Sequence, residues 1–226
     1  MKKIMTVAMA LIVACGFVFA DNKSEQKEIR KERQEIRKLA KKELNARVDK
    51  VVKRETKRLT KEGWLVKPGE LPLDRQLERV YLMQYEYDES LFPKYIMGEA
   101  SSVAGNYDAA KTAALSLAIN NLAGQIQTEV TALIENTVGN KQLSAEDAES
   151  IVETVMASKN LISQSIGRTI PVMECYRVNS KKNYEVLVRI AYNAEMAKEA
   201  TRKAVRKELE QKGARLHEQL DKVLGF

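Results

Sequence analysis

The residue types that most often carry out chemistry in proteins are thinly spread in this sequence. Histidine occurs once, at His217, on a C-terminal stretch whose polar pattern predicts an exposed helix. A catalytic triad built on histidine also needs a third group that holds the ring, and no nearby pattern supplies one. Cys175 lies in the apolar run 169–178, where a thiol usually fills space in the core. We therefore expect no catalytic residue.

Short motifs with a defined mechanism are missing from the sequence as well. It contains no glycine-rich phosphate loop after a strand, no paired cysteines and no pair of histidines, so we expect no cofactor and no metal site. The adjacent acids Glu146 and Asp147 follow Ser144 at a predicted helix start, where carboxylates are favoured on electrostatic grounds. The sequence thus favours a protein that is not an enzyme, with a hydrolase as the enzymatic alternative.

The first twenty residues have the pattern of a secretory signal peptide. Two lysines precede an apolar run from Ile4 to Ala20, and the sequence turns polar at Asp21. Cleavage between Ala20 and Asp21 fits the residues before the cut. The alternative is lipidation of Cys15, which follows a lipobox-like Ile-Val-Ala, although the run stays apolar beyond this cysteine. Both routes predict an exported protein, in the periplasm or associated with the outer membrane.

Residues 21–62 are predicted to form a basic helical arm. From Lys23 to Glu62 there are sixteen Lys and Arg against eight Asp and Glu, whereas the whole chain carries a net charge of +7. The apolar residues of the arm make a thin stripe, which predicts a solvated helix that docks lightly on the rest of the chain. The other interpretation is a basic surface for an anionic partner such as lipid headgroups, lipopolysaccharide or another envelope polymer. Nucleic acid is not an expected partner of an exported chain.

Residues 63–226 are expected to form one α+β domain with a core at about 94–209. Its organising element is a helix from Asn106 to Val138, in which apolar residues three and four apart predict a buried face that includes Leu117 and Leu122. Asn106 or Asp108 can cap the start of this helix. Three strands are predicted, and further helices follow from Ser144 to Ile166 and from Asn193 onward. The strands are expected at 94–104, 169–178 and 184–192.

The predicted fold is therefore a small antiparallel sheet of about three strands, covered on one face by long helices and preceded by the charged arm. Gly98 and the small residues after it favour a first strand that a helix crosses closely. Between arm and sheet, Trp64 and the group Tyr81, Tyr85 and Tyr87 are spaced for packing within a helical region. Stacking of these rings on a sugar is the alternative interpretation.

Three segments of the domain together resemble a known family. They are the strand 98–104, the Ala-rich helix 114–130 (ALSLAINNLAGQIQTEV) and the hairpin 172–192 (VMECYRVNSKKNYEVLVRIAY). In this combination the chain is similar, over roughly 94–209, to the LPP-twenty (twenty-kilodalton) lipoprotein family. The resemblance implies an envelope-associated, non-enzymatic domain without a defined ligand, and it implies a lipidated cysteine, for which the sequence offers Cys15.

Taken together, these observations predict a non-catalytic exported cell-envelope protein with a structural or interaction role. The alternative is a binding module for an envelope ligand such as a glycan, a lipid or a peptide. The sequence leaves the oligomeric state open, including a homo-oligomer.

Overall fold

The computed structural model describes residues 22–139 and 143–226. The predicted cleavage site at Ala20 and Asp21 and the alternative lipidation site at Cys15 lie outside these residues. The elements follow in the order α1 (Asn22–Lys38), α2 (Lys41–Lys61), α3 (Leu73–Gln84), β1 (Tyr95–Ala104), α4 (Tyr107–Gly139), α5 (Ala145–Ala157), α6 (Lys159–Ser165), β2 (Ile170–Val178), β3 (Tyr184–Asn193), α7 (Ala194–Lys212) and α8 (Ala214–Leu224).

The strands form one antiparallel sheet in the order β1-β3-β2. With about 65% of the chain in helices, the molecule has the predicted α+β class. The clearest strand pattern, at 184–192, forms the central strand. Pro171, which has no N–H to donate, lies on the edge strand β2 beside an irregularity in its pairing with β3.

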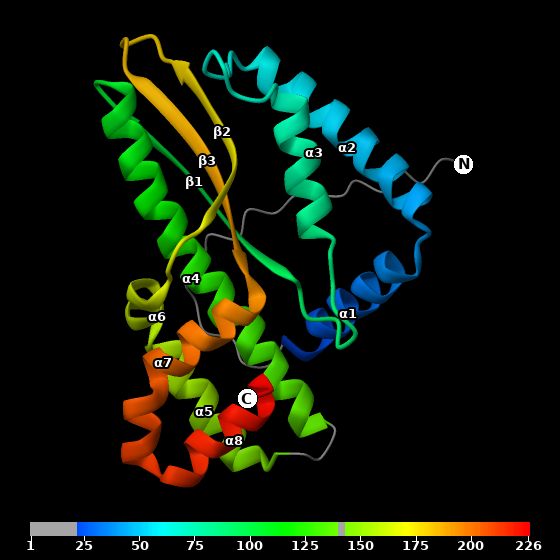
Figure 1. Ribbon diagram of the computed structural model, residues 1–226, viewed down its shortest axis with the longest axis vertical. Coiled ribbons are helices and arrows are strands. Elements are labelled where there is room, and N and C mark those ends of the chain that lie inside the picture. The colour runs from blue at the N-terminus through cyan, green and yellow to red at the C-terminus, as the bar shows by residue number, and fades with distance from the viewer. Residues whose placement is uncertain (1–21, 140–142) are drawn as a thin grey trace.

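Helix α4 lies along one face of the sheet and is its main cover (Figure 1). Of the two candidates for its cap, Asn106 caps the helix: the Asn106 side-chain oxygen accepts a hydrogen bond from the Ala109 N–H at 2.9 Å. The sheet approaches this helix closely at Gly98, where an added Cβ would lie 2.5 Å from the Ala118 carbonyl oxygen. The prediction that Leu117 faces the sheet is wrong: this side chain is 47% exposed. The buried face consists of Ala110, Ala114, Ala118, Leu122, Ala123, Ile126, Gln127, Val130 and Ile134.

Helices cover both faces of β3, so the expectation of a single covered face is also wrong. Val186, Val188, Ile190 and Tyr192 pack toward α4 in what we call the helical core. Leu187 and Ala191 point to the opposite face, where they join α2 and α3 in a second cluster that we call the arm core. Figure 1 shows α2 and α3 on the side of the sheet away from α4.

Helix α2 is embedded more deeply than a lightly docked arm would be. It buries four residues of its stripe against α3 and the sheet, namely Val48, Val52, Glu55 and Leu59. Trp64, at the end of the arm, is buried in the same core, which confirms its predicted packing role.

Helices α5 to α8 gather around the far half of α4 (Figure 1). The single helix predicted from Ser144 to Ile166 is divided at Ser158 into α5 and α6, and the final helix is divided at Gly213. His217, on α8, is buried rather than exposed as predicted, with its Nε2 atom 3.7 Å from Asp221 of the same helix. Among the described helices, none has a stretch both long and apolar enough to span a membrane.

Candidate functional site

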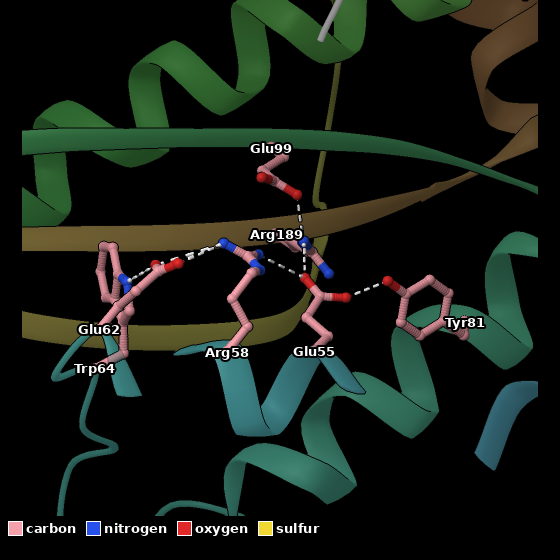
Figure 2. Close-up of polar contacts among 7 residues, drawn as sticks. All are labelled: Glu55, Arg58, Glu62, Trp64, Tyr81, Glu99 and Arg189. Carbon is pink, nitrogen blue, oxygen red and sulfur yellow. Dashed lines mark hydrogen bonds and ion pairs between the residues drawn. The ribbon is translucent and has the colours of Figure 1, made fainter. Parts of the chain in front are cut away.

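The most unusual feature of the molecule is a charged side chain, Arg189, buried in the middle of the central strand. Its side chain is 7% exposed and lies between the sheet and α2. Its Nη2 donates to Glu55 Oε1 at 2.8 Å, and its Nε donates to the carboxylate of Glu99 on β1. The Glu55 side chain is 6% exposed, whereas that of Glu99 is 48% exposed. Figure 2 shows the three side chains converging from two strands and one helix.

Local structure places this pair inside the arm core. Side chains alternate along a strand, so Arg189 shares with Leu187 and Ala191 the face that looks toward α2 and α3. On α2, Glu55 falls at helical spacing between Val52 and Leu59, in the buried stripe. A buried charge is costly unless it is paired. The pair therefore favours a single register of α2 on the sheet.

The remaining oxygen of Glu55 is satisfied by a tyrosine. The Tyr81 hydroxyl of α3 donates to Glu55 Oε2 in a buried contact. Burial raises the pKa of Tyr81 well above its ordinary value, and the hydrogen bond to Glu55 raises it further. For Arg189, burial alone would lower the pKa, but the charges of Glu99 and Glu55 outweigh it, so the guanidinium pKa is raised. The network thus holds a charged arginine and a neutral tyrosine around one carboxylate.

The network continues along α2 toward the surface. Arg58 lies 3.5 Å from Glu55 and 3.1 Å from Glu62, and the Trp64 indole N–H donates to Glu62 at 3.3 Å (Figure 2). On the strand side, the guanidinium of Arg177 lies 4.7 Å from the centre of the Trp64 ring. The end of the arm is thereby attached to the β2–β3 hairpin as well as to the middle of the sheet.

The opposite face of α2 presents a row of positive charges to solvent. At 100° per residue, the row lies about half a turn of the helix away from the buried stripe. It extends about 16 Å at 1.5 Å per residue. None of its members forms an ion pair with a described residue. This row, which we call the basic face, consists of Lys50, Lys53, Arg54, Lys57 and Lys61.

The predicted aromatic group is divided by the structure. Tyr81 is buried in the network, and its ring stacks on Tyr85 with centroids 6.2 Å apart. Tyr87 lies further on, 5.3 Å under the guanidinium of Arg33, which pairs with Glu129 at 2.5 Å. The first two rings therefore have the packing role that their spacing predicted.

Two grooves meet at Tyr95, at the start of β1. One, with a volume of about 470 Å³, is lined mainly by α3 and has Arg75, Glu78, Arg79 and Glu86 among its walls. The other, of about 300 Å³, is lined by Tyr87, the Arg33–Glu129 pair and the first residues of β1. Charged side chains line both grooves, so neither is an apolar cleft rimmed by tyrosines.

The residues first considered for chemistry are brought into no common site. Cys175 is buried in the arm core, and burial raises the pKa of its thiol to about 12, so the thiol is protonated and unreactive at neutral pH. His217 lies at the other end of the molecule, in the helical core region. In the part of the chain that the structure describes, no group of three or more His, Cys, Asp or Glu residues is arranged to hold a metal ion.

Sequence reasoning missed the Arg189 network. The signal was present in two places: an acid at a core position of the arm stripe, and an arginine between Val188 and Ile190 in the most apolar strand. Each residue alone reads as an ordinary polar position, because 134 residues separate Glu55 from Arg189. Comparison of the chain with models of protein families, with curated proteins and with solved structures finds no match.

Proposed function

We propose that this chain is a non-catalytic exported protein of the cell envelope, whose role is structural or one of interaction. Export is supported by the leader pattern that ends at Ala20, and an envelope role by the resemblance to the LPP-twenty lipoprotein family over roughly 94–209. The observation that carries the interaction role is the basic face of α2, a row of cations on one side of the helix that form no ion pair with the described residues.

The partner that this face suits is an anionic surface of the envelope. Each Lys or Arg close to an anionic membrane surface contributes about 1 kcal/mol. The buried Glu55–Arg189 pair holds α2 so that all five cations point away from the sheet together. Because the helix is already folded, binding orders only the side chains of the row. The attraction is largely screened beyond roughly 8–10 Å at physiological salt.

The test is sedimentation of the protein with vesicles that contain phosphatidylglycerol, at low and at high salt, against neutral phosphatidylcholine vesicles. The variant Lys53→Glu, Arg54→Glu, Lys57→Glu reverses three charges of the basic face. Removing three cations at about 1 kcal/mol each should weaken binding roughly 100-fold or more. The matched control, with the same change in net charge on an exposed part of α7, is Lys203→Glu, Arg206→Glu, Lys207→Glu.

Equal loss of binding in the two triple variants would mean that net charge, and not the basic face, attracts the vesicles. Binding that persists at high salt in the first variant would also contradict the proposal. Isolated envelopes depleted of lipid, used in place of vesicles, separate a polymer partner from a lipid one.

Processing of the leader is tested by intact-mass analysis of the exported protein. Cleavage between Ala20 and Asp21 predicts a mature chain that begins at Asp21. A mass that corresponds to a diacylglyceryl group on an N-terminal Cys15 would instead show that the chain is a lipoprotein and is anchored by its lipid.

The alternative function is a binding module for a glycan, a lipid or a peptide. The observation in its favour is the groove beside Tyr87 and Tyr95, which combines aromatic rings with the Arg33–Glu129 pair. If Tyr87→Ala abolishes binding to isolated envelopes while the α2 triple variant leaves binding intact, this alternative replaces the first.

A further inference from the structure

The two edges of the sheet differ in how they are protected. On β2, backbone bonds join Leu65 to Tyr176 in both directions, at 2.7 and 2.8 Å, and Pro171 interrupts the far end. On β1, the pairing with β3 is unbroken over ten residues, and no described segment pairs with the other side of the strand. Natural sheets usually guard such an edge with lysine, proline or a bulge. From Tyr95 to Ala104, β1 has none of these.

Backbone groups on the outer side of β1 belong to its odd-numbered residues. In β2, the N–H groups of the even-numbered residues Glu174 and Tyr176 bond to Gln76 and Leu65 and so point away from β3. The odd-numbered residues of β2 therefore bond to β3, and the register pairs them with odd-numbered residues of β3. The even-numbered residues of β3 therefore bond to β1, and the register pairs them with even-numbered residues there. The bond from the Ala194 N–H to the Lys94 carbonyl fits this alternation.

One backbone group on the outer side of β1 already has a partner on helix α4. The Asn121 side chain donates to the Glu99 carbonyl at 2.8 Å. Past Glu99, the outward groups of Ser101 and Val103 face away from β3, and the Val103 side chain is 52% exposed. Leu117 lies one helical turn before Asn121, on the same side of α4, so this exposed leucine borders the unprotected edge. We call the backbone of residues 100–104, together with Leu117, the open edge.

We propose that the open edge is a homodimer interface, at which β1 of a second copy of this chain adds antiparallel to β1. A pairing centred on Ser102 sets Ser101 of each copy opposite Val103 of the other. It thereby satisfies the outward groups of both residues and places Glu99 opposite Gly105 rather than opposite another carboxylate. The sheet then continues through both copies as six strands.

The chemistry of the edge favours this occupant. Residues 100–104 (Ala-Ser-Ser-Val-Ala) carry no charge in a chain of net charge +7, so two copies approach here without the repulsion that their basic faces would produce. A two-fold axis uses the same patch on both copies, which the symmetry of the Ser101–Val103 pairing provides. The two copies of Leu117 lie on the same face of the joined sheet, where each can lose its exposure.

Sedimentation of the full chain over about 1 to 100 µM tests self-association across the weak to moderate range. We expect a concentration-dependent dimer. Val103→Lys should shift the midpoint of dimerisation at least tenfold, because it places a charge on the edge. Val178→Lys is the matched control, since Val178 is 50% exposed on the other edge strand. A monomer at all concentrations, or equal effects of the two variants, overturns the proposal.

A cysteine substitution tests the register directly. Directly opposite residues in a non-hydrogen-bonded antiparallel pair have Cα atoms about 4.5 Å apart, within the range that a disulfide spans. Ser102→Cys should therefore cross-link two copies upon mild oxidation, whereas Ser180→Cys, in the exposed hairpin loop, should not. Cross-linking of both variants alike, or a cross-link from Ser102→Cys to a different protein, would show that a second copy is not the occupant. Circular dichroism of each variant establishes that the fold is retained.

Discussion

Substitution of Glu55 tests whether the buried Glu55–Arg189 pair stabilises the fold. In Glu55→Ala, Glu99, which is 48% exposed, is the one acid among the described residues that still pairs with Arg189, and the Tyr81 hydroxyl loses its acceptor. Breaking a buried ion pair by removing one partner costs about 3–5 kcal/mol. Because Glu99 remains and water can reach it, we expect the lower end, about 3 kcal/mol. That is a large share of a typical total stability of about 5–15 kcal/mol.

Urea denaturation followed by circular dichroism measures this loss. With a slope of about 2–3 kcal/mol per molar urea for a chain of this size, the midpoint should fall by about 1 M or slightly more. The control is Glu43→Ala, which removes an exposed carboxylate from the same helix. A double variant, Glu55→Leu with Arg189→Met, should recover most of the loss, since replacing a whole buried pair with apolar residues is often neutral.

A midpoint for Glu55→Ala that matches that of Glu43→Ala would refute the reasoning. It would mean that Arg189 reaches solvent when its partner is removed, and that the pair does not hold α2 on the sheet. A double variant less stable than Glu55→Ala would show instead that the arm core is too tightly shaped to accept the apolar pair.

Three further predictions concern packing and titration. Gly98→Ala should lower the thermal midpoint clearly, because its Cβ would meet the Ala118 carbonyl at 2.5 Å and overpacking costs about 1–3 kcal/mol; Gly105→Ala, with open space around it, should not. Leu122→Ala should cost about 2–5 kcal/mol in a denaturation experiment, whereas Leu117→Ala, at an exposed site, should cost the monomer little. The Cys175 thiol, with its pKa raised by burial from 9.0 to about 12, contributes stability that is complete below pH 9 and is lost as the pH rises toward 12. Thermal midpoints should therefore fall less steeply above pH 9 in Cys175→Ala than in the unmodified chain.

Local signals in the sequence located most of the elements correctly. Short-range chemistry fixes a helix start, so the cap at Ser144 forms as predicted, and Asn106, one of two candidates, caps α4. The alternating pattern of 184–192 likewise identified the central strand. The close crossing at Gly98 was also recognisable, since only glycine leaves room for a helix backbone there.

The errors share one physical cause, which is that periodicity states how residues are spaced but not what lies against them. Leu117 fits the apolar spacing of its helix, yet no described residue covers that side of α4, and the side chain is 47% exposed. His217 sits among charged residues, yet α8 folds back on α7 and buries it. The second covered face of the sheet was missed for the same reason, because the position of α2 depends on a partner far along the chain.

The large sequence separation between Glu55 and Arg189 delays the formation of their ion pair during synthesis of the chain. The ribosome makes about 5–20 residues per second, so Arg189 is added roughly 7 to 27 seconds after Glu55. Throughout that interval Glu55 lacks its buried arginine, and the apolar stripe of α2 can pack on α3 but not on β3. The arm can pack on α3 as soon as both helices are made, but its ion pair with the sheet forms only after β3.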